Sequence, residues 1–232
     1  MKNIRPLFVA IVTICLINLF PGKAHSQCIG GKTPLNEIGV RLGSITDASH
    51  VGGANIPGEN LHTGTLNGIH YKRYSAVGAF RMSLGLTRFD YEDRRNCPNC
   101  LRTDGKVNGM KFRIGYEWFT FLGPVEPFFA LNAILSYGTY KAESWSLGGA
   151  VYEETITNRE RRGVGIGPTA GLRVYLGYAI SISAETSVEA MMYGRKTTIS
   201  RITPEASTVS RQNNYFDTTF QPLNWLSLNV LF

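Results

Sequence analysis

Apolar and polar side chains alternate along several stretches of the chain. Between Val164 and Leu176 the even positions are almost all aliphatic, whereas the odd positions carry glycine, threonine, arginine and tyrosine. The stretches Ile180 to Tyr193 and Met110 to Trp118 repeat this pattern. Successive side chains of a β-strand point to opposite faces, so a period of two predicts three strands here.

Weaker alternation adds further strands. It occurs at Ile38–Ile45, Gly68–Tyr74, Ala79–Tyr91, Pro127–Tyr140 and in the terminal stretch Thr219–Phe232. Together with the first three, these runs make eight strands, and no segment sustains the 3.6-residue apolar period of a helix. The sequence therefore predicts an all-β fold.

The connections between these strands alternate in length. Long polar stretches lie near 46–67, 92–106, 141–162 and 196–217, and short ones lie near 75–78, 119–125 and 177–179. Outer-membrane β-barrels combine short periplasmic turns with long extracellular loops. The pattern predicts an eight-stranded antiparallel up-and-down barrel, and an even strand count places both termini in the periplasm.

The N-terminal residues predict a secretory signal peptide. Lys2 and Arg5 precede an apolar run from Leu7 to Phe20, and Ala24 and Ser26 supply the small residues of a cleavage site. As a helix, this run would reach only about 21 Å across a bilayer core of roughly 30 Å. We expect residues 1–26 to be the signal peptide and residues 27–232 to form one barrel domain. Removing the three cations of the leader lowers the formal net charge from +7 to +4.

Alternation alone does not say which face points inward, because a soluble lipocalin-type barrel also alternates, with its apolar face inside. Three features favour lipid on the outside. Small residues suit a narrow lumen and crowd the polar face at Gly39, Gly43, Gly85, Gly115, Gly165, Gly167, Gly171, Ser181 and Ser183. The same face carries six cations and five anions, which predicts a lumen charge network of Glu37, Arg41, Arg81, Lys111, Arg113, Glu117, Glu126, Arg173, Glu185, Glu189 and Arg195. Aromatic residues near strand ends predict girdles at the membrane interfaces, at Trp118, Phe119, Phe121, Phe128, Phe129, Tyr175, Tyr178, Trp225 and Phe232.

Three segments resemble the small eight-stranded outer-membrane β-barrel family, of the OmpA-type and OmpX-type. They are the terminal "LSLNVLF", the strand "GVGIGPTAGLRVYLG" and the following "AISISAETSVEA", and the resemblance covers roughly residues 36 to 232. It implies that the last strand is a signal read by the barrel-assembly machinery. That role falls on Leu226, Leu228, Val230 and Phe232.

Two prolines depart from the pattern of a regular strand. Pro168 and Pro222 fall on the expected lipid face, where a proline lacks the N–H that a strand ladder uses. We expect a β-bulge near each proline. Tyr71 and Arg73 share one face of a strand, which predicts that this end of the strand lies near an interface.

"CPNC", from Cys97 to Cys100, is the sharpest local motif. A disulfide between the two cysteines is the favoured interpretation in an oxidising extracellular loop, with a metal site and free thiols as alternatives. No second CxxC accompanies it. Cys28 is expected at the opposite end of the barrel, where a lipid anchor is an alternative although the preceding residues make a poor lipobox.

No catalytic, cofactor-binding or metal-binding set can be assembled from the remaining motifs. The stretch Gly165 to Ala170 matches GxGxxA, but a strand follows where a dinucleotide site needs a helix. Glu185 and Glu189 lie about 13 Å apart along one strand, too far for a hydrolytic pair, so we expect them to pair with arginines across the lumen. The basic segment "NRERRG", from Asn158 to Gly163, is suited to phosphates or acidic partners or is ordinary solvated charge.

These features predict a non-enzymatic protein of the outer membrane of a Gram-negative bacterium. An eight-stranded barrel leaves an interior just wide enough for side chains to fill, so we expect a plugged lumen and a structural or interaction role. A small passive or gated pore is the alternative, and a lipid A-modifying enzyme is less favoured. The expected partners are membrane lipid and lipopolysaccharide, the barrel-assembly machinery and another envelope protein, without nucleic acid.

Overall fold

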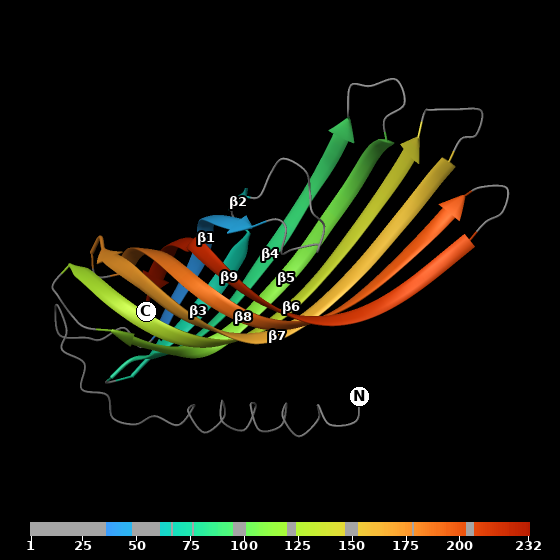
Figure 1. Cartoon of the computed structure of the whole chain (residues 1–232). Coiled ribbons are helices and arrows are strands. Elements are labelled where there is room, and N and C mark those ends of the chain that lie inside the picture. The colour runs from blue at the N-terminus through green and yellow to red at the C-terminus, as the bar shows by residue number, and fades with distance from the viewer. Residues whose placement is uncertain are drawn as a thin grey trace.

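The computed structural model is an antiparallel sheet rolled into a ring (Figure 1). It describes residues 36–47, 61–65, 67–75, 77–94, 101–119, 124–146, 153–177, 179–202 and 207–232, which contain strands and no helix. The strands are β1 (Asn36–Asp47), β2 (Leu61–Thr65), β3 (Gly68–Tyr74), β4 (Ala79–Arg94), β5 (Leu101–Phe119), β6 (Val125–Ser146), β7 (Glu153–Tyr175), β8 (Ile180–Ile202) and β9 (Ser207–Leu231). The predicted signal peptide, Cys28 and the Cys97–Cys100 motif lie outside the described residues.

The nine strand elements make the eight predicted barrel strands, because β2 and β3 are two halves of one interrupted strand. Both halves pair with β1, β3 through Val40↔Ile69 and β2 through Gly43↔Thr65. The other strands pair in sequence order from β3 to β9, and β1 pairs with β9 to close the ring. The prediction of an all-β, eight-stranded, up-and-down barrel is therefore confirmed.

The last residue is held by the seam of the barrel. The backbone N–H of Phe232 donates to the carbonyl of Asn36, and the N–H of Asn36 donates to the carbonyl of Phe232, both at 3.0 Å. Leu231 pairs with Glu37, and its N–H donates to the carbonyl of Ala179. The two ends of the described chain thus meet in one ladder, which explains the regular alternation up to the last residue.

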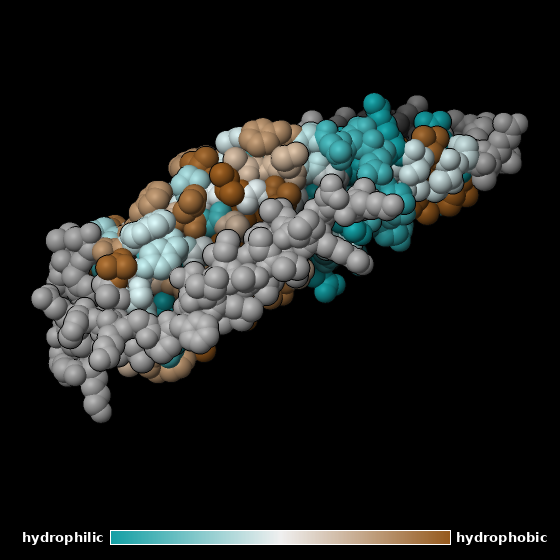
Figure 2. All heavy atoms as spheres, turned by 90° about the horizontal axis from the view of Figure 1, so that it is seen from below, coloured by the Kyte–Doolittle hydropathy of each residue, from teal (hydrophilic) through white to brown (hydrophobic). Residues whose placement is uncertain are grey.

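An apolar belt surrounds the ring. Outward-facing aliphatic and aromatic side chains are between 40% and 67% exposed at Ile38, Val40, Ile69, Leu86, Met110, Trp118, Phe129, Leu131, Leu135, Val164, Ile166, Leu172, Ile180, Val188, Met192, Phe216, Phe220, Leu228, Val230 and Phe232. Figure 2 shows brown side chains gathered over the barrel and a teal hydrophilic band beyond them. Apolar residues outside and charged residues inside are the arrangement of a barrel that spans a membrane. Within the described residues, no helix is long and apolar enough to cross a membrane.

The strands run far beyond this belt. β9 comprises 25 residues, whereas a tilted strand needs only about 9–11 residues to cross a bilayer. The expected loops 92–106, 141–162 and 196–217 are therefore wrong in large part, because β4 to β9 continue through most of those residues. Among the described residues, β9 pairs with β1 only as far as Leu223, and β4 pairs with β3 only as far as Gly85. Above these points the six strands β4 to β9 continue as a sheet, visible as the long hairpins of Figure 1, and among the described residues no further strand pairs with its two edges.

The two prolines are accommodated differently. The ladder between β8 and β9 shifts register between Glu185↔Trp225 and Ser187↔Gln221, so the predicted bulge at Pro222 is confirmed. The hydroxyl of Thr186 donates to the carbonyl of Gln221 at 2.9 Å and satisfies one backbone group of the bulge. At Pro168 the prediction of a bulge is wrong, because the pairs on both sides of it, Ile166↔Ala190 and Thr169↔Ser187, keep one register.

Candidate functional site

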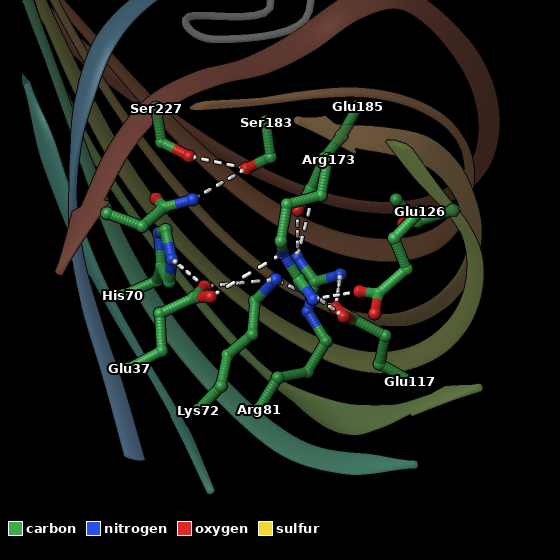
Figure 3. A network of polar contacts seen from close by, with 12 residues as sticks. Glu37, His70, Lys72, Arg81, Glu117, Glu126, Arg173, Ser183, Glu185 and Ser227 are labelled. Atoms are coloured by element: carbon green, nitrogen blue, oxygen red, sulfur yellow. Dashed lines mark hydrogen bonds and ion pairs between the residues drawn. The ribbon is translucent and has the colours of Figure 1, made fainter. Parts of the chain in front are cut away.

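The lower half of the lumen is organised around Arg173, which β7 places at the centre of the ring (Figure 3). Its guanidinium contacts carboxylates from three other strands: Glu117 at 2.5 Å, Glu37 at 3.5 Å, and Glu126. The side chains of all four residues are 0% exposed. An ion pair is stable in such a place only when each charge is compensated and hydrogen bonded. Here each of the three carboxylates is paired with Arg173, whose Nε has no hydrogen-bond partner among the described residues.

Two further cations tie this cluster to the opposite wall. The ammonium of Lys72, from β3, lies 2.9 Å from Glu117 and 3.4 Å from Glu37. Arg81, from β4, lies 3.1 Å from Glu117 and donates two hydrogen bonds to Glu185 of β8, at 2.7 and 2.8 Å. The network therefore crosses the lumen and links strands that are not neighbours in the sheet.

Uncharged side chains saturate the remaining acceptors of this cluster. The hydroxyl of Tyr74 donates to Glu37 at 2.7 Å, and a ring nitrogen of His70 lies 3.1 Å from the other oxygen of that carboxylate. On the facing wall the hydroxyl of Tyr175 donates to Glu126 at 3.2 Å. Such saturation makes a buried polar cluster rigid and specific in geometry.

An aromatic ring packs against two of the cations. The Phe128 ring centroid lies 4.9 Å from the Lys72 ammonium and 5.2 Å from the Arg173 guanidinium. Phe128 is only 5% exposed. The negative face of an aromatic ring attracts a cation most strongly where water is excluded, so this ring adds to the plug rather than to the membrane surface.

A second cluster lies further along the lumen. Glu189 accepts hydrogen bonds from Lys111 at 2.6 Å, from Arg113 at 2.6 Å and from Gln221 at 3.2 Å. Arg41 stands 3.8 Å above the ring of Trp225, a residue that is 1% exposed. Glu185 and Glu189 thus pair with arginines of β4 and β5, across the lumen from β8.

Glycines make room for these side chains. A Cβ atom at Gly171 would lie 2.3 Å from the Phe128 ring, and one at Gly85 would lie 2.9 Å from the Arg41 guanidinium. At Gly39 it would lie 2.1 Å from the His70 ring. Each of these distances is shorter than any ordinary van der Waals contact, so the small residues of the inner face are required by the large ones opposite.

Ten of the eleven expected network residues share these two clusters: Glu37, Arg41, Arg81, Lys111, Arg113, Glu117, Glu126, Arg173, Glu185 and Glu189. Only Arg195 does not, because it lies further up β8 with its guanidinium 5.4 Å from the Tyr215 ring. Sequence reasoning missed Lys72 and His70, although both alternate with the outward-facing Ile69 in the run from Gly68 to Tyr74.

The predicted outer aromatic girdle is wrong for three of its residues. Phe128, Trp225 and Tyr175 do not belong to an outer aromatic girdle, because their side chains point into the lumen. Trp118 and Phe129 do stack on the outside, with ring centroids 6.2 Å apart. The sequence already indicated the inward direction of Trp225, because the alternation places it on the polar face of the last strand.

The basic segment from Asn158 to Gly163 is part of β7 and not a loop. Its side chains alternate between the two faces of the sheet. Arg161 is 5% exposed and lies on the inner face, whereas Arg162 points outward and pairs with Glu160 at 2.6 Å. Hydrogen bonding to that carboxylate raises the pKa of Arg162. The segment therefore divides its charge between the lumen and the outer surface.

The proposed assembly signal faces the membrane. Leu228 and Val230 are 41% and 51% exposed, Phe232 is 60% exposed, and Leu226 lies between them and the bulge at Pro222.

Among the described residues, no group of three or more His, Cys, Asp or Glu side chains is arranged to hold a metal ion.

The closed ring, the apolar belt and the lumen of paired charges define a transmembrane β-barrel of the outer-membrane type. No family model and no curated protein sequence matches the chain. The crystal structure of Acinetobacter baumannii CarO is similar to 86% of this chain and 98% of that one, with a TM-score of 0.40 and 9% sequence identity. OmpA-type or OmpX-type character therefore remains a resemblance in the sequence.

Proposed function

We propose that this protein is a non-conducting, non-enzymatic barrel of the outer membrane with a structural or interaction role. The observation that carries the proposal is the buried network around Arg173. It fills the cross-section of the lumen with side chains that are 0% to 5% exposed and that bond to each other from β1, β3, β4, β5, β6, β7 and β8. An ion or solute would have to break several of these buried pairs to pass.

The open sheet supports an interaction role. Among the described residues, no strand pairs with the outer edge of β9 from Ser207 to Pro222, and an exposed strand edge is the usual template for an added strand. Val209 lies on this edge and is 63% exposed. We propose that an extended segment of another envelope protein pairs with this edge, as in other cases of β-strand addition.

Conductance tests the sealed lumen. We expect the purified, folded barrel to give no steady conductance in a planar lipid bilayer. Steady, reproducible channels from heat-modifiable monomer would overturn the proposal and establish the alternative, a small pore. Unchanged mass of lipid A from an overexpressing strain is the expected result for a barrel without enzymatic activity.

The native mass in mild detergent tests the interaction role. We expect the protein extracted from its own outer membrane to migrate with a second polypeptide, and we expect Val209→Lys to release it. Thr198→Lys is the matched control, because it adds the same charge to β8, whose two edges are both paired. A monomer in both the native protein and the control would contradict the interaction role.

A further inference from the structure

A cavity of about 40 Å³ lies directly above the buried network, at the upper end of the closed ring. Four cationic side chains line it, Arg41, Lys111, Arg113 and Arg161, together with one carboxylate, that of Glu189. The proposed function makes no use of this cavity. The space holds about three water molecules, at roughly 10–15 Å³ each.

The lower cluster around Arg173 and the lining of the cavity above it carry opposite excesses of charge. The lower cluster has four carboxylates, on Glu37, Glu117, Glu126 and Glu185, and three permanent cations, on Lys72, Arg81 and Arg173. The cavity lining reverses this balance, with four cations and one carboxylate. A buried cluster with such an excess of one sign is stabilised by any counter-ion that enters it.

The cations of the cavity repel one another. The positive charge of Arg113 acts unfavourably on that of Arg41, and the charges of Arg113 and Arg161 act unfavourably on that of Lys111. Glu185 and Glu189 act favourably on these cations, and a bound anion would add to that stabilisation. Glu189 accepts bonds from two of them, Lys111 and Arg113, and Asn224 accepts another from Arg113.

Arg161 brings an unused donor to the cavity. Its side chain is held by the Tyr193 ring, 4.1 Å from the guanidinium, and donates a long hydrogen bond to the Tyr215 hydroxyl at 3.4 Å. The residue is 5% exposed, and its Nε has no hydrogen-bond partner in the described part of the chain. A buried guanidinium N–H without a partner is costly, and an oxyanion in the cavity would accept from it.

We propose that this cavity is a binding site for the phosphate group of a small solute. Phosphate offers several acceptor oxygens and close to two negative charges, which suits four converging cations better than a single carboxylate does. The hydroxyl of Thr219 and the amide of Gln221 complete the polar lining. Lys111 keeps 23% of its side chain exposed, so solvent reaches the site.

Calorimetric titration of the folded barrel with inorganic phosphate, at constant ionic strength, tests the proposal. We expect saturable binding that Arg161→Gln weakens by about tenfold or more, the usual effect of losing one charge-assisted hydrogen bond. Arg159→Gln is the matched control: it removes the same charge from the same face of β7, where Arg159 stacks 5.2 Å from the Tyr140 ring and does not line the cavity. Arg161→Lys should bind phosphate more tightly than Arg161→Gln.

Heat-modifiable migration on a gel shows that each variant is folded before it is titrated. Competition by lipid A micelles would identify a lipid headgroup as a second source of the phosphate, and a lack of competition would identify a soluble ligand. The proposal is overturned if folded wild-type protein shows no saturable binding of millimolar phosphate. It is equally overturned if Arg159→Gln weakens binding as much as Arg161→Gln, because the effect would then be a general electrostatic one.

Discussion

Replacement of Arg173 by methionine gives the sharpest test of the sealed lumen. Methionine keeps an unbranched apolar stem without the charged guanidinium, so the change leaves the carboxylates of Glu37, Glu117 and Glu126 in a place where none of their side chains is exposed. Removing one partner of a buried ion pair costs about 3–5 kcal/mol because the other charge stays uncompensated. Arg173 has three such partners, and Lys72 and Arg81 compensate only part of the loss. We therefore expect Arg173→Met to lower the free energy of unfolding by at least about 3 kcal/mol.

Urea unfolding in lipid vesicles, followed by tryptophan fluorescence, measures this change. Trp225 is a suitable reporter because it lies inside the lumen and is 1% exposed. Arg162→Met is the control, since that arginine points outward and pairs with Glu160 at the surface, and it should leave the unfolding curve unchanged. Adding Glu117→Gln to Arg173→Met should recover part of the loss. Equal unfolding midpoints for Arg173→Met and Arg162→Met would refute the idea that the network holds the lumen together.

Three further predictions follow from the packing, the membrane surface and the sequence. Gly171→Ala should lower the thermal unfolding midpoint, because the new Cβ atom would lie 2.3 Å from the Phe128 ring, whereas Gly177→Ala, with no atom within 4 Å, should not; overpacking of this kind costs roughly 1–3 kcal/mol. Phe232→Glu should reduce the fraction of heat-modifiable barrel in the outer membrane relative to Phe232→Tyr, and equal fractions would contradict the sorting role of the last residue. If Cys97 and Cys100 form a disulfide, the mass of the denatured protein should show that they are not alkylated before reduction and that both are alkylated after it.

The fold could be predicted where one face of a strand meets lipid. In Val164–Leu176 and Ile180–Tyr193 the lipid face must be apolar and the lumen face small or charged. The residues of the two faces can therefore be told apart in the sequence. Beyond the belt both faces of β7 and β8 are polar, and the alternation vanishes although the strands continue. For that reason residues 141–162 and 196–217 were expected to be loops.

The inner face of β6 shows why some lumen residues could not be assigned. In the run from Phe128 to Leu135 both faces carry apolar side chains, because Phe128 packs against two cations and Ile134 packs with Met191 and Tyr193 inside the lumen. An apolar residue on such a strand gives no sign of its direction. Partners across the lumen, such as Arg81 and Glu185, are also set by barrel curvature, which a linear sequence does not contain.

The contrast between the lower lumen, filled with paired charges, and the upper sheet has a consequence for how such a chain can evolve. In the lower lumen a single change of charge leaves several buried partners without a counter-charge. Substitutions there must therefore arise as compensating pairs and will be rare. The upper sheet, with its polar faces, accepts single changes at little cost. Divergence among descendants of this protein should therefore concentrate in the upper half of β4 to β9, where new surfaces can arise while the part within the membrane keeps its side chains.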